Sequence, residues 1–495
     1  MQMKKYLLFL VASMLAIVAR AADGDTFAYE GLNFKVISEA EHSVAVARNK
    51  SASGDISIPS YAVNGSSRYF VTEIERSAFA VCANLTSVTI PNSVTVIGTD
   101  AFYSCDKLTS ITIPSSVTSI GEGSLGLCER MTEITVENGN PNYSSENGVL
   151  FNADKTTLIQ CPAGKKGSYT IPNSVTAIGT QAFKLCRRLT SVTIPNSVTA
   201  IETDAFYRCS KFTSITIPNS VVAIGEEAFG NCESLTEIIV EDGNPNYSSE
   251  NGVLFNVDKT TLIQCPCGKT EEYSIPTSVT AIEANAFYYC GKLTSVSIPN
   301  SVTEIGSSTF YHCSSLASVT IPNSVNAIGS SAFSYCSSLT SVTIPTSVTA
   351  IELSTFYNCR SLATVTIPAS VSKIGGSAFA KCENLKTIYD LNPTPQTVEA
   401  DSFSGVPEDA VVYIPAGSFN KYFVAEGWTQ FTDFREMTSG IDDVLTDVDD
   451  DAPVDAYDLQ GMSVLHNASA AELESLPAGL YIVRQGNNVR KIAVK

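Results

Sequence analysis

The chain has 495 residues, and its formal net charge at pH 7 is −19. The first 21 residues carry three of its positive charges, and without them the charge is −22. This acidic balance argues against nucleic acid or an anionic membrane surface as a partner.

The first predicted element is a secretory signal peptide over residues 1–21. Lys4 and Lys5 precede an apolar run over 6–18, and the segment 19–21 has the Ala-x-Ala pattern of a cleavage site. No later run reaches the roughly 18 apolar residues that span a bilayer. We therefore predict an exported protein without a transmembrane segment, either secreted or located at the cell surface on the outer-membrane exterior.

After a predicted N-terminal cap over residues 22–54, a repeat of about 23 residues dominates the region 55–417. Its clean form, LTSVTIPNSVTxIGxxAFxxC, begins at Leu85. The Leu-x-x-Val-x-Ile spacing predicts a short, half-buried strand, which Pro91 ends, and a second short strand follows. Phe102 and Cys105 then lie one helical or 3₁₀ turn apart and face the same core. The fold class is therefore a β-rich solenoid of about 23-residue coils, each with short parallel strands and one short turn.

The repeat places a cysteine in each coil. A chain of this length would usually form three or more domains. That expectation does not apply here, because stacked coils extend one core. Eleven cysteines at equivalent small, apolar positions cannot all pair, so we predict buried free thiols. They are Cys82, Cys105, Cys128, Cys186, Cys209, Cys232, Cys290, Cys313, Cys336, Cys359 and Cys382.

Two intervals between repeat cysteines are longer and are near copies of each other, displaced by 104 residues. They contain predicted hairpin inserts near 137–171 and 241–275, each with a polar leading loop that we expect to project from the stack. The loop is a candidate binding site, and packing of the hairpin against the core is the alternative. The candidate binding residues in the loops are Tyr143, Ser144, Ser145, Tyr247, Ser248 and Ser249.

Threonine recurs between the two inward positions of the first strand. A flat threonine row could bind an ordered surface such as polysaccharide or ice, whereas β-propensity and cross-strand pairing are the simpler explanation. The row consists of Thr89, Thr112, Thr193, Thr216, Thr320, Thr343 and Thr366.

The period decays after Cys382. Residues 418–438 are predicted as a C-terminal cap, 439–454 as an acidic linker and 455–495 as a small β module with four strands. Asp447, Asp449 and Asp451 have the spacing of a calcium loop, but the glycine at its sixth place is missing, and a solvated linker is the simpler interpretation.

No catalytic constellation is visible in the sequence. His42, His312 and His466 form no motif with the cysteines, and the repeat strands contain few acids for paired-carboxylate chemistry. His312 replaces a small polar residue beside a repeat cysteine and is interpreted as a surface substitution. We predict no enzyme activity and no cofactor.

The LxxVxIPxSVxxIGxxAFxxC coil resembles the BspA-like group of leucine-rich repeat proteins. This resemblance implies a leucine-rich repeat solenoid in a secreted or surface-displayed bacterial protein. Some members bind host matrix proteins or other bacteria, and the resemblance supplies no catalytic residues. The final segment is similar to sorting domains of type IX secretion cargo at residues 457–462, 476–483 and 491–495, although a clear Tyr-Pro-Asn-Pro strand is missing.

Taken together, these features predict a non-catalytic adhesion or protein-interaction protein. Its partner would be an extracellular protein on host matrix or on a bacterial surface, and the module 455–495 would engage the secretion machinery. The alternative function is a carbohydrate-binding accessory protein for glycan capture.

Overall fold

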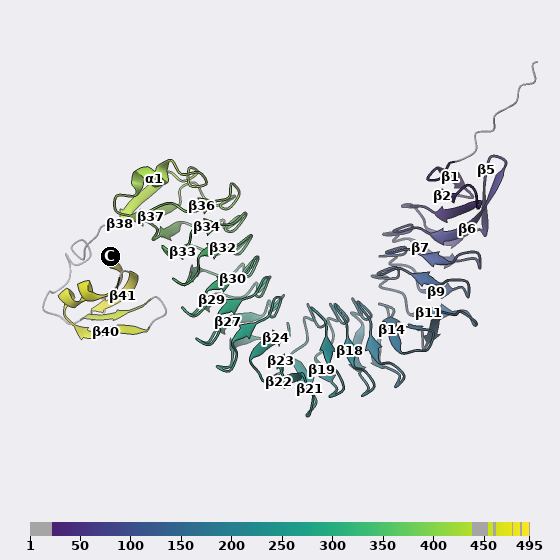
Figure 1. The fold of residues 1–495 in the computed structure, drawn as a ribbon, viewed down its shortest axis with the longest axis horizontal. Helices are drawn as coiled ribbons and strands as arrows, with labels where there is room; N and C mark the ends of the chain where they lie inside the picture. Colours follow the sequence, from purple (N-terminus) through teal and green to yellow (C-terminus); the bar gives the residue numbers. More distant parts are fainter. Residues whose placement is uncertain (1–21, 438–453, 459–461, 478, 486–487, 495) are drawn as a thin grey trace, which may run out of the picture. The chain divides into compact units, whose positions relative to one another are not determined.

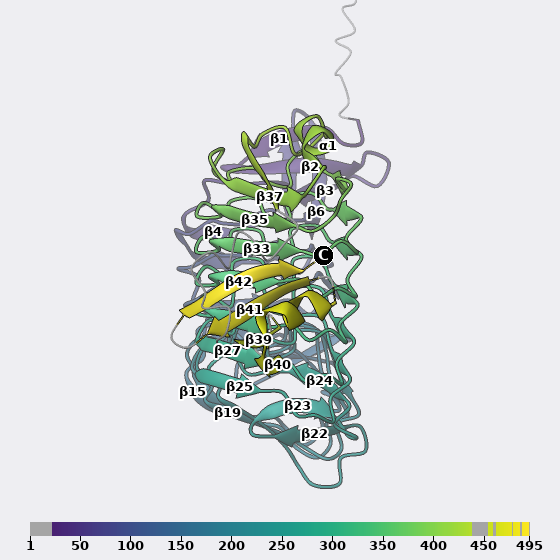
Figure 2. The ribbon, with the colours of Figure 1, turned by 90° about the vertical axis from the view of Figure 1, so that its left-hand side faces the viewer.

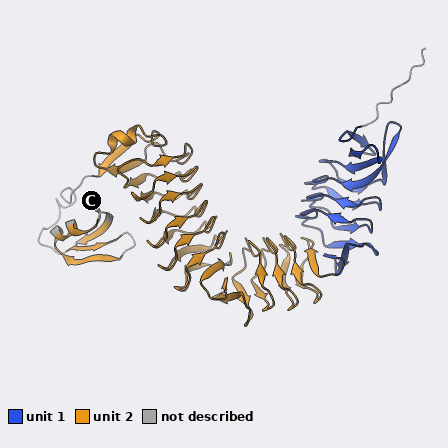
Figure 3. Ribbon diagram, in the orientation of Figure 1, with its two compact units in different colours: residues 1–154 blue, residues 155–495 orange. Residues whose placement is uncertain are grey.

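The computed structural model describes residues 22–437, 454–458, 462–477, 479–485 and 488–494 (Figure 1). The chain separates into two compact units, residues 1–154 and residues 155–495 (Figure 3). The predicted signal peptide lies outside the described residues.

A single coil shows why the repeat folds as it does. Leu339, Val342 and Ile344 turn inward along β31 (Ser341–Thr343) and are buried. Pro345 follows the strand, its carbonyl accepts a hydrogen bond from the Val348 N–H (3.1 Å), and the chain turns there. The second strand of the coil is β32 (Ala350–Ile351), whose Ile351 also faces the core.

The coil closes at Phe356 and Cys359, which are both fully buried. The Cys359 N–H donates to the Phe356 carbonyl (3.3 Å), and Asn358 between them has a φ of +60°. The predicted helical or 3₁₀ turn is therefore a hydrogen-bonded turn with one left-handed residue. This conformation keeps phenylalanine and cysteine inward, whereas Tyr357 between them is half-buried and Asn358 is buried. We call these two intervening positions, in every coil, the turn corner.

The first strand of each coil pairs in parallel with that of the next coil wherever the ladder is regular. In residues 1–154 the paired first strands are β4 (Gly54–Ser57) with β7 (Leu85–Thr89), and β9 (Ser110–Ile113) with β11 (Glu133–Val136). In residues 155–495 they form four ladders: β15 (Gly167–Thr170) with β17 (Leu189–Thr193); β19 (Ser214–Ile217) with β21 (Glu237–Val240); β25 (Glu271–Ser274), β27 (Leu293–Ser297) and β29 (Ser318–Thr320); and β31, β33 (Thr364–Ile367), β35 (Thr387–Asp390), β37 (Val411–Pro415) and β38 (Asp433–Met437). We call the solvent-facing side of these strands the strand face.

The second strands are shorter and form their own parallel ladders. In residues 1–154 the order is β1 (Thr26–Tyr29), β2 (Leu32–Ser38), β3 (Ser43–Val46), β6 (Ser67–Ile74), β8 (Val96–Ile97) and β10 (Ser119–Ile120), with β5 (Tyr61–Asn64) paired to β6. The antiparallel pairs β1–β2 and β2–β3 form the N-terminal end of this sheet. In residues 155–495 the ladders are β14 (Thr157–Gln160), β16 (Ala177–Ile178), β18 (Ala200–Ile201) and β20 (Ala223–Ile224); β24 (Thr261–Gln264), β26 (Ala281–Ile282), β28 (Glu304–Ile305) and β30 (Ala327–Ile328); and β32, β34 (Lys373–Ile374) and β36 (Thr397–Val398).

The core consists of side chains repeated from coil to coil. Phenylalanine rings stack nearly parallel from Phe287 to Phe403, with centroids 4.9–5.4 Å apart. All fourteen cysteines are free and buried, which confirms the prediction for the eleven repeat positions. Most repeat thiols donate to the phenylalanine carbonyl of the preceding coil, as Cys336 does to Phe310 O (3.2 Å). The cysteine thus fills a small apolar site and also satisfies a backbone acceptor.

The C-terminal cap covers the last coil with aromatic side chains. The short helix α1 (Phe419–Phe423) brings Tyr422 against Trp428, with ring centroids 5.2 Å apart, and Trp428 lies 5.3 Å from Phe403. Both Tyr422 and Trp428 are fully buried. The end of the phenylalanine ladder is therefore shielded from water.

The C-terminal module has its own sheet, in the order β40 (Ser463–Ala468), β39 (Val454–Tyr457), β41 (Gly479–Gln485) and β42 (Asn488–Val494), and the predicted linker before it lies outside the described residues up to residue 453. A 3₁₀ helix, η2 (Ala470–Ser475), connects β40 to β41. Val454, Ala456, Leu473 and Val483 belong to its separate buried cluster. The four strands predicted for this segment are all present.

Candidate binding surfaces

The threonines of the strand face do not form one continuous flat row. Thr89 and Thr112 in residues 1–154 are exposed, as are Thr193, Thr216 and Thr320 in residues 155–495. In the parallel register, however, Thr216 lies beside Ile239. The residue at this register position therefore changes from threonine to isoleucine on β21, the strand that precedes the second insert.

Thr366 is a correction to the candidate site. It lies in register between Thr343 and Tyr389 and is only 3% exposed, so it cannot contact a partner. Neighbouring strands rather than solvent surround this threonine, and it supports the simpler explanation of β-propensity and cross-strand packing.

The strand face ends in an aromatic pair that the sequence analysis did not single out. Tyr389 on β35 and Tyr413 on β37 occupy the register position that threonine holds in earlier coils. Their rings are stacked, with centroids 4.9 Å apart and an interplanar angle of 19°. Figure 2 shows β33, β35 and β37 side by side in this part of the ladder. Both tyrosines are half-buried.

Arg435 on β38 continues this row, in register with Tyr413. Its guanidinium donates twice to Asp433, from Nε to Oδ1 (3.1 Å) and from Nη2 to Oδ2 (2.8 Å). This bidentate pair lowers the pKa of Asp433 and raises that of Arg435. Burial, and then the neighbouring Tyr413, raises the pKa of Tyr389, so its hydroxyl remains protonated and able to donate at neutral pH. The row presents two aromatic rings, their hydroxyls and an oriented cation.

A buried carboxyl lies beneath this aromatic pair. Asp390 follows Tyr389 on β35 and points inward, with none of its surface exposed. Oδ1 accepts a hydrogen bond from the Asn392 N–H (3.0 Å), whereas Oδ2 is buried without a hydrogen-bond partner. Burial raises the Asp390 pKa to about 7. Strand β35 therefore contributes a half-buried tyrosine and, as the next residue, a buried titratable group.

The two inserts interrupt the ladder of first strands. In the second copy, β22 (Tyr247–Glu250) and β23 (Val253–Asn256) form an antiparallel hairpin around Asn251-Gly252, and both turn residues have positive φ. The Ile238 N–H on β21 donates to Gly252 O (2.9 Å), so the hairpin covers the open edge of β21. Strand β23 then pairs with β24, which resumes the second-strand ladder.

The candidate loop residues of this insert bind the preceding coils. The Tyr247 hydroxyl accepts from the Ile224 N–H (2.9 Å), and Ser249 Oγ accepts from the Val240 N–H (3.0 Å). Ser248 Oγ donates to Asn256 O across the hairpin (2.8 Å). The expectation that this segment projects from the stack is therefore wrong, because its side chains satisfy backbone groups of neighbouring strands.

The first copy repeats these bonds within residues 1–154. β12 (Tyr143–Glu146) pairs with β13 (Val149–Asn152), and the Tyr143 hydroxyl accepts from the Ile120 N–H (2.9 Å). Ser144 Oγ donates to Asn152 O (2.8 Å), and Ser145 Oγ accepts from the Val136 N–H (2.9 Å). The same correction applies to both loops, and a contact of these residues with a ligand stays a prediction.

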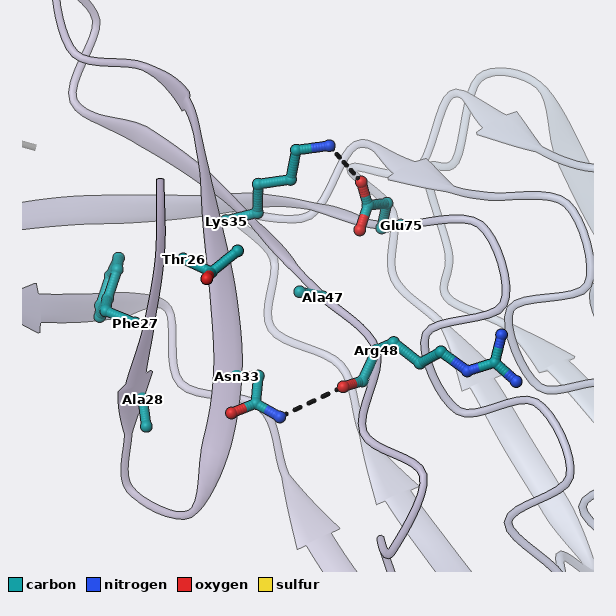
Figure 4. Close-up of a pocket in the computed structure, with 8 residues that line it drawn as sticks. All are labelled: Thr26, Phe27, Ala28, Asn33, Lys35, Ala47, Arg48 and Glu75. Atoms are coloured by element: carbon teal, nitrogen blue, oxygen red, sulfur yellow. Dashed lines mark hydrogen bonds and ion pairs between the residues drawn. The ribbon is translucent and has the colours of Figure 1, made fainter. Parts of the chain in front are cut away.

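The N-terminal cap contains a surface depression of about 500 Å³ (Figure 4). The Lys35 ammonium at its rim pairs with Glu75 (2.8 Å), and Asn33 Nδ2 donates to the Arg48 carbonyl (3.2 Å). The Arg48 side chain extends away from Thr26 and Phe27, which lie across the depression. These polar groups serve one another rather than converging on an open centre.

Metal-binding groups and membrane-spanning helices were sought in the part of the chain that the structure describes. No group of three or more His, Cys, Asp and Glu side chains there is arranged to hold a metal ion. The calcium candidate Asp447, Asp449 and Asp451 lies outside the described residues. Among the described residues, no helix is long and apolar enough to cross a membrane.

A sequence signal for the aromatic pair did exist. Tyr389 and Tyr413 stand at the place of the repeat threonine in TIYD and VVYIP, where the period decays. Such pairs can be found by comparing the same solvent-facing strand position in successive coils and noting where aromatic residues occur in neighbouring coils.

Comparison with known proteins supports the architecture. The family model for the BspA type leucine rich repeat region matches residues 67–166, 165–264 and 257–386, which is more than half of the chain. A solved leucine rich cell surface protein from Faecalibacterium prausnitzii A2-165 is 30% identical, with 74% of this chain and 94% of that chain covered and a TM-score of 0.50. A leucine-rich repeat protein from Bacteroides ovatus ATCC 8483 is 25% identical, with 83% and 100% covered and a TM-score of 0.34. A search of curated protein sequences found no match.

Proposed function

Because this chain belongs to the BspA-type leucine-rich repeat family, we propose that it is a non-catalytic adhesion protein at the bacterial surface that binds an extracellular protein through its strand face. The similar protein from F. prausnitzii is described as a cell surface protein. The predicted signal peptide over residues 1–21 agrees with export. The partner class is a host matrix protein or a protein on another bacterium.

The row formed by Tyr389, Tyr413 and Arg435 carries this proposal. Tyrosine and arginine are enriched at the centres of protein interfaces, where they contribute most of the binding energy. Here the two rings stack on each other and Asp433 orients the guanidinium, so little side-chain freedom is lost on binding. The threonines of the earlier coils lack both the contact area and the charge of this row.

The test replaces the two tyrosines by the residue that other coils use at the same position. The mature chain, residues 22–495, is compared with the variant Tyr389→Thr/Tyr413→Thr for binding to immobilised matrix proteins and to whole bacteria. We expect at least tenfold weaker binding, the size of one strong interface contact. The matched control is Thr320→Ser, which changes a threonine elsewhere on the strand face and keeps a small hydroxyl side chain there.

Two results would contradict the proposal. One is that the mature chain binds neither the matrix proteins nor the cells. The other is that the double variant binds as tightly as the unchanged chain while its thermal unfolding is the same. A circular dichroism melt of every variant separates lost binding from lost folding.

We also propose that the module 455–495 directs the protein to the surface, by sorting or by anchoring. Its separate buried cluster supports independent folding. Deleting residues 439–495 should leave the unfolding transition of the repeat region unchanged and abolish surface location, measured by protease accessibility on intact cells. Unfolding of the shortened protein, or its continued display at the surface, would overturn this assignment.

A further inference from the structure

A second group of aromatic side chains lies at the turn corner of four consecutive coils, those that contain β26, β28, β30 and β32. These coils bury phenylalanine and cysteine, and at least one of the two positions between them carries a ring. All members are half-buried. We call this group the aromatic row, and it consists of Tyr288, Tyr289, Tyr311, His312, Tyr335 and Tyr357.

The rings repeat from coil to coil with nearly constant spacing. His312 lies between Tyr289 and Tyr335, with centroids 4.5 and 5.5 Å away and interplanar angles of 9° and 13°. Beside this line, Tyr288 stacks on Tyr311 at 5.1 Å. Tyr357 meets Tyr335 edge to face at 5.4 Å. The result is a continuous stripe of rings along successive coils.

The rings are offset rather than stacked directly face to face. Flat rings in contact are about 3.5 Å apart, so nearly parallel centroids 5.5 Å apart must be slipped sideways. Each ring in the line through His312 therefore leaves part of one face and its outer edge uncovered by the next. A ligand lying along the stripe can contact several ring surfaces in turn.

The fold does not require aromatic residues at these positions. Tyr289, His312 and Tyr335 all have φ near +60°, and the same left-handed position is filled elsewhere by non-aromatic residues, which are Val81, Ser104, Leu127, Leu185, Arg208, Asn231, Asn358 and Lys381. Short polar residues adopt this conformation more readily than large ones. Four consecutive coils with rings at this corner are therefore a local feature added to the repeat.

The surroundings of the aromatic row are polar but uncharged at its centre. The two central turns, residues 307–315 and 330–338, contain no Asp, Glu, Lys or Arg, although the whole chain has a net charge of −19. They contribute serine hydroxyls instead, such as Ser314 and Ser337. Charged groups mark only the two ends, where Arg208 lies 6.0 Å from the Tyr289 ring and Lys381 lies 5.1 Å from the Tyr357 ring.

The hydroxyl groups of the row are available as donors. Burial, as the largest effect, raises the pKa of Tyr288, Tyr289 and Tyr311. These phenols therefore remain protonated in neutral solution. The row offers apolar ring faces together with hydroxyl donors and acceptors, and its two central turns contain no Asp, Glu, Lys or Arg.

We propose that the aromatic row is a binding site for an uncharged polysaccharide chain that lies along the coils. Sugar rings present C–H groups on their faces and hydroxyls at their edges, which matches exposed tyrosine faces flanked by tyrosine and serine hydroxyls. A polymer with a repeating unit can use the same contact once per coil, and several weak contacts then act together.

The dimensions of the row favour a polysaccharide over a folded protein. Four coils at ~4.8 Å spacing give a stripe about 15–20 Å long and only one or two rings wide. A stable protein interface covers about 800 Å² on each partner, with charged groups commonly placed at its rim. A narrow, uncharged and periodic stripe suits an extended chain better than a globular surface.

The test replaces the left-handed members of the row by the residue that the chain itself uses at that position. The variant Tyr289→Asn/His312→Asn/Tyr335→Asn copies Asn231 and Asn358 and so preserves the backbone conformation. Mature chain and variant are compared by affinity gel electrophoresis and calorimetry against hydroxyethyl cellulose, a galactomannan and an arabinoxylan. We expect the mature chain to bind at least one of them and the triple variant to bind at least tenfold more weakly.

Two controls separate this site from the proposed protein-binding surface. Tyr103→Ser removes a tyrosine at the first corner position, equivalent to Tyr311, from a coil without the aromatic row, and the variant should bind polysaccharide as the unchanged chain does. The strand-face variant Tyr389→Thr/Tyr413→Thr should also retain polysaccharide binding. The polysaccharide proposal can therefore hold even if the adhesion proposal fails, and the adhesion proposal can hold even if the polysaccharide proposal fails.

The proposal is overturned by any of four results. These are binding to none of the three polysaccharides, equal binding by a folded triple variant, binding only to acidic polysaccharides such as heparin, and loss of protein or cell binding rather than polysaccharide binding in the triple variant. The last result would assign the aromatic row to a protein partner.

Discussion

The strand face and the turn corner of residues 155–495 cover the same core but differ in what they present to solvent. On the strand face, small threonines dominate, and aromatic rings appear only at Tyr389 and Tyr413, beside the C-terminal cap. At the turn corner, Tyr207 precedes the insert, and the contiguous group of rings runs from Tyr288 to Tyr357. The two aromatic groups therefore lie on different sides of the coil and in different coils.

This difference shows which positions of the repeat are free to vary. Inward residues are constrained, because each phenylalanine stacks on the next and most repeat thiols donate to a carbonyl of the coil before. Outward residues contact other surface residues of their own and neighbouring coils, so a run of similar residues creates a surface without disturbing the core. Function in such a fold is expected where outward residues depart from the repeat in several neighbouring coils.

The largest expected effect comes from a change beneath both surfaces. Phe333 is fully buried between Phe310 and Phe356, at centroid distances of 5.1 and 5.4 Å. Phe333→Ala should lower the free energy of unfolding by about 3–5 kcal/mol, measured in urea, because the cavity cannot collapse without shifting both neighbours. The outward Tyr335→Asn, two residues away, should cost less than about 1 kcal/mol. Equal losses would contradict the division between inward and outward positions.

The second prediction concerns the pH dependence of stability at the end of the strand face where Asp390 lies. Burial raises the Asp390 pKa to about 7, from about 4 in an unfolded chain. The unfolded state therefore loses its proton first as pH rises from about 4 to 7, and the stability of the strand-face end should fall by on the order of 1–4 kcal/mol across that window. Asp390→Asn should remove this decline, measured as the difference in unfolding free energy between the two proteins at pH 5 and pH 8. A constant difference would show that Asp390 stays ionised when folded.

The third prediction concerns the insert, which interrupts the strand face. Tyr247→Phe and Ser249→Ala each remove the acceptor of a backbone N–H, from Ile224 and Val240 respectively. Each should cost about 1–2 kcal/mol in chemical unfolding. The matched control is Ser248→Ala, which removes a donor within the hairpin and leaves both N–H groups satisfied. Unchanged stability in the first two variants would return these residues to the candidate binding loop.

Sequence periodicity was sufficient for the architecture but not for the insert. The inward Leu-x-x-Val-x-Ile strand and the buried Phe–Cys pair follow from local spacing, because each coil solves the same packing problem. By contrast, Asn244 fixes the insert by donating to Pro218 O and Val221 O, which precede it by 26 and 23 residues. A hydrogen bond from a side chain to the backbone of an earlier coil leaves no hydrophobic pattern in the sequence. The sequence of the leading loop therefore resembled that of a loop that projects into solvent.

The aromatic pair was missed for a related reason. Tyr389 and Tyr413 are 24 residues apart, and each alone resembles an isolated replacement of threonine. Only the parallel register, which places Tyr389 opposite Tyr413, brings the two rings into contact. Candidate sites on a solenoid are therefore found more easily by comparing equivalent positions of successive coils than by following the chain in order.

The smallest effect is expected from the exposed threonines, and it tests whether they belong to a binding surface at all. Thr320 on β29 lies in register with Ser297, is exposed, and has no aromatic neighbour in its row. Thr320→Ala should cost only about 0.5–1 kcal/mol, as β-propensity and the lost cross-strand contact imply, and should leave protein and polysaccharide binding unchanged. Combining it with Thr193→Ala should give additive losses, because the two sites share no neighbours. A tenfold loss of binding in either variant would instead extend the functional part of the strand face from the tyrosine pair to the whole threonine row.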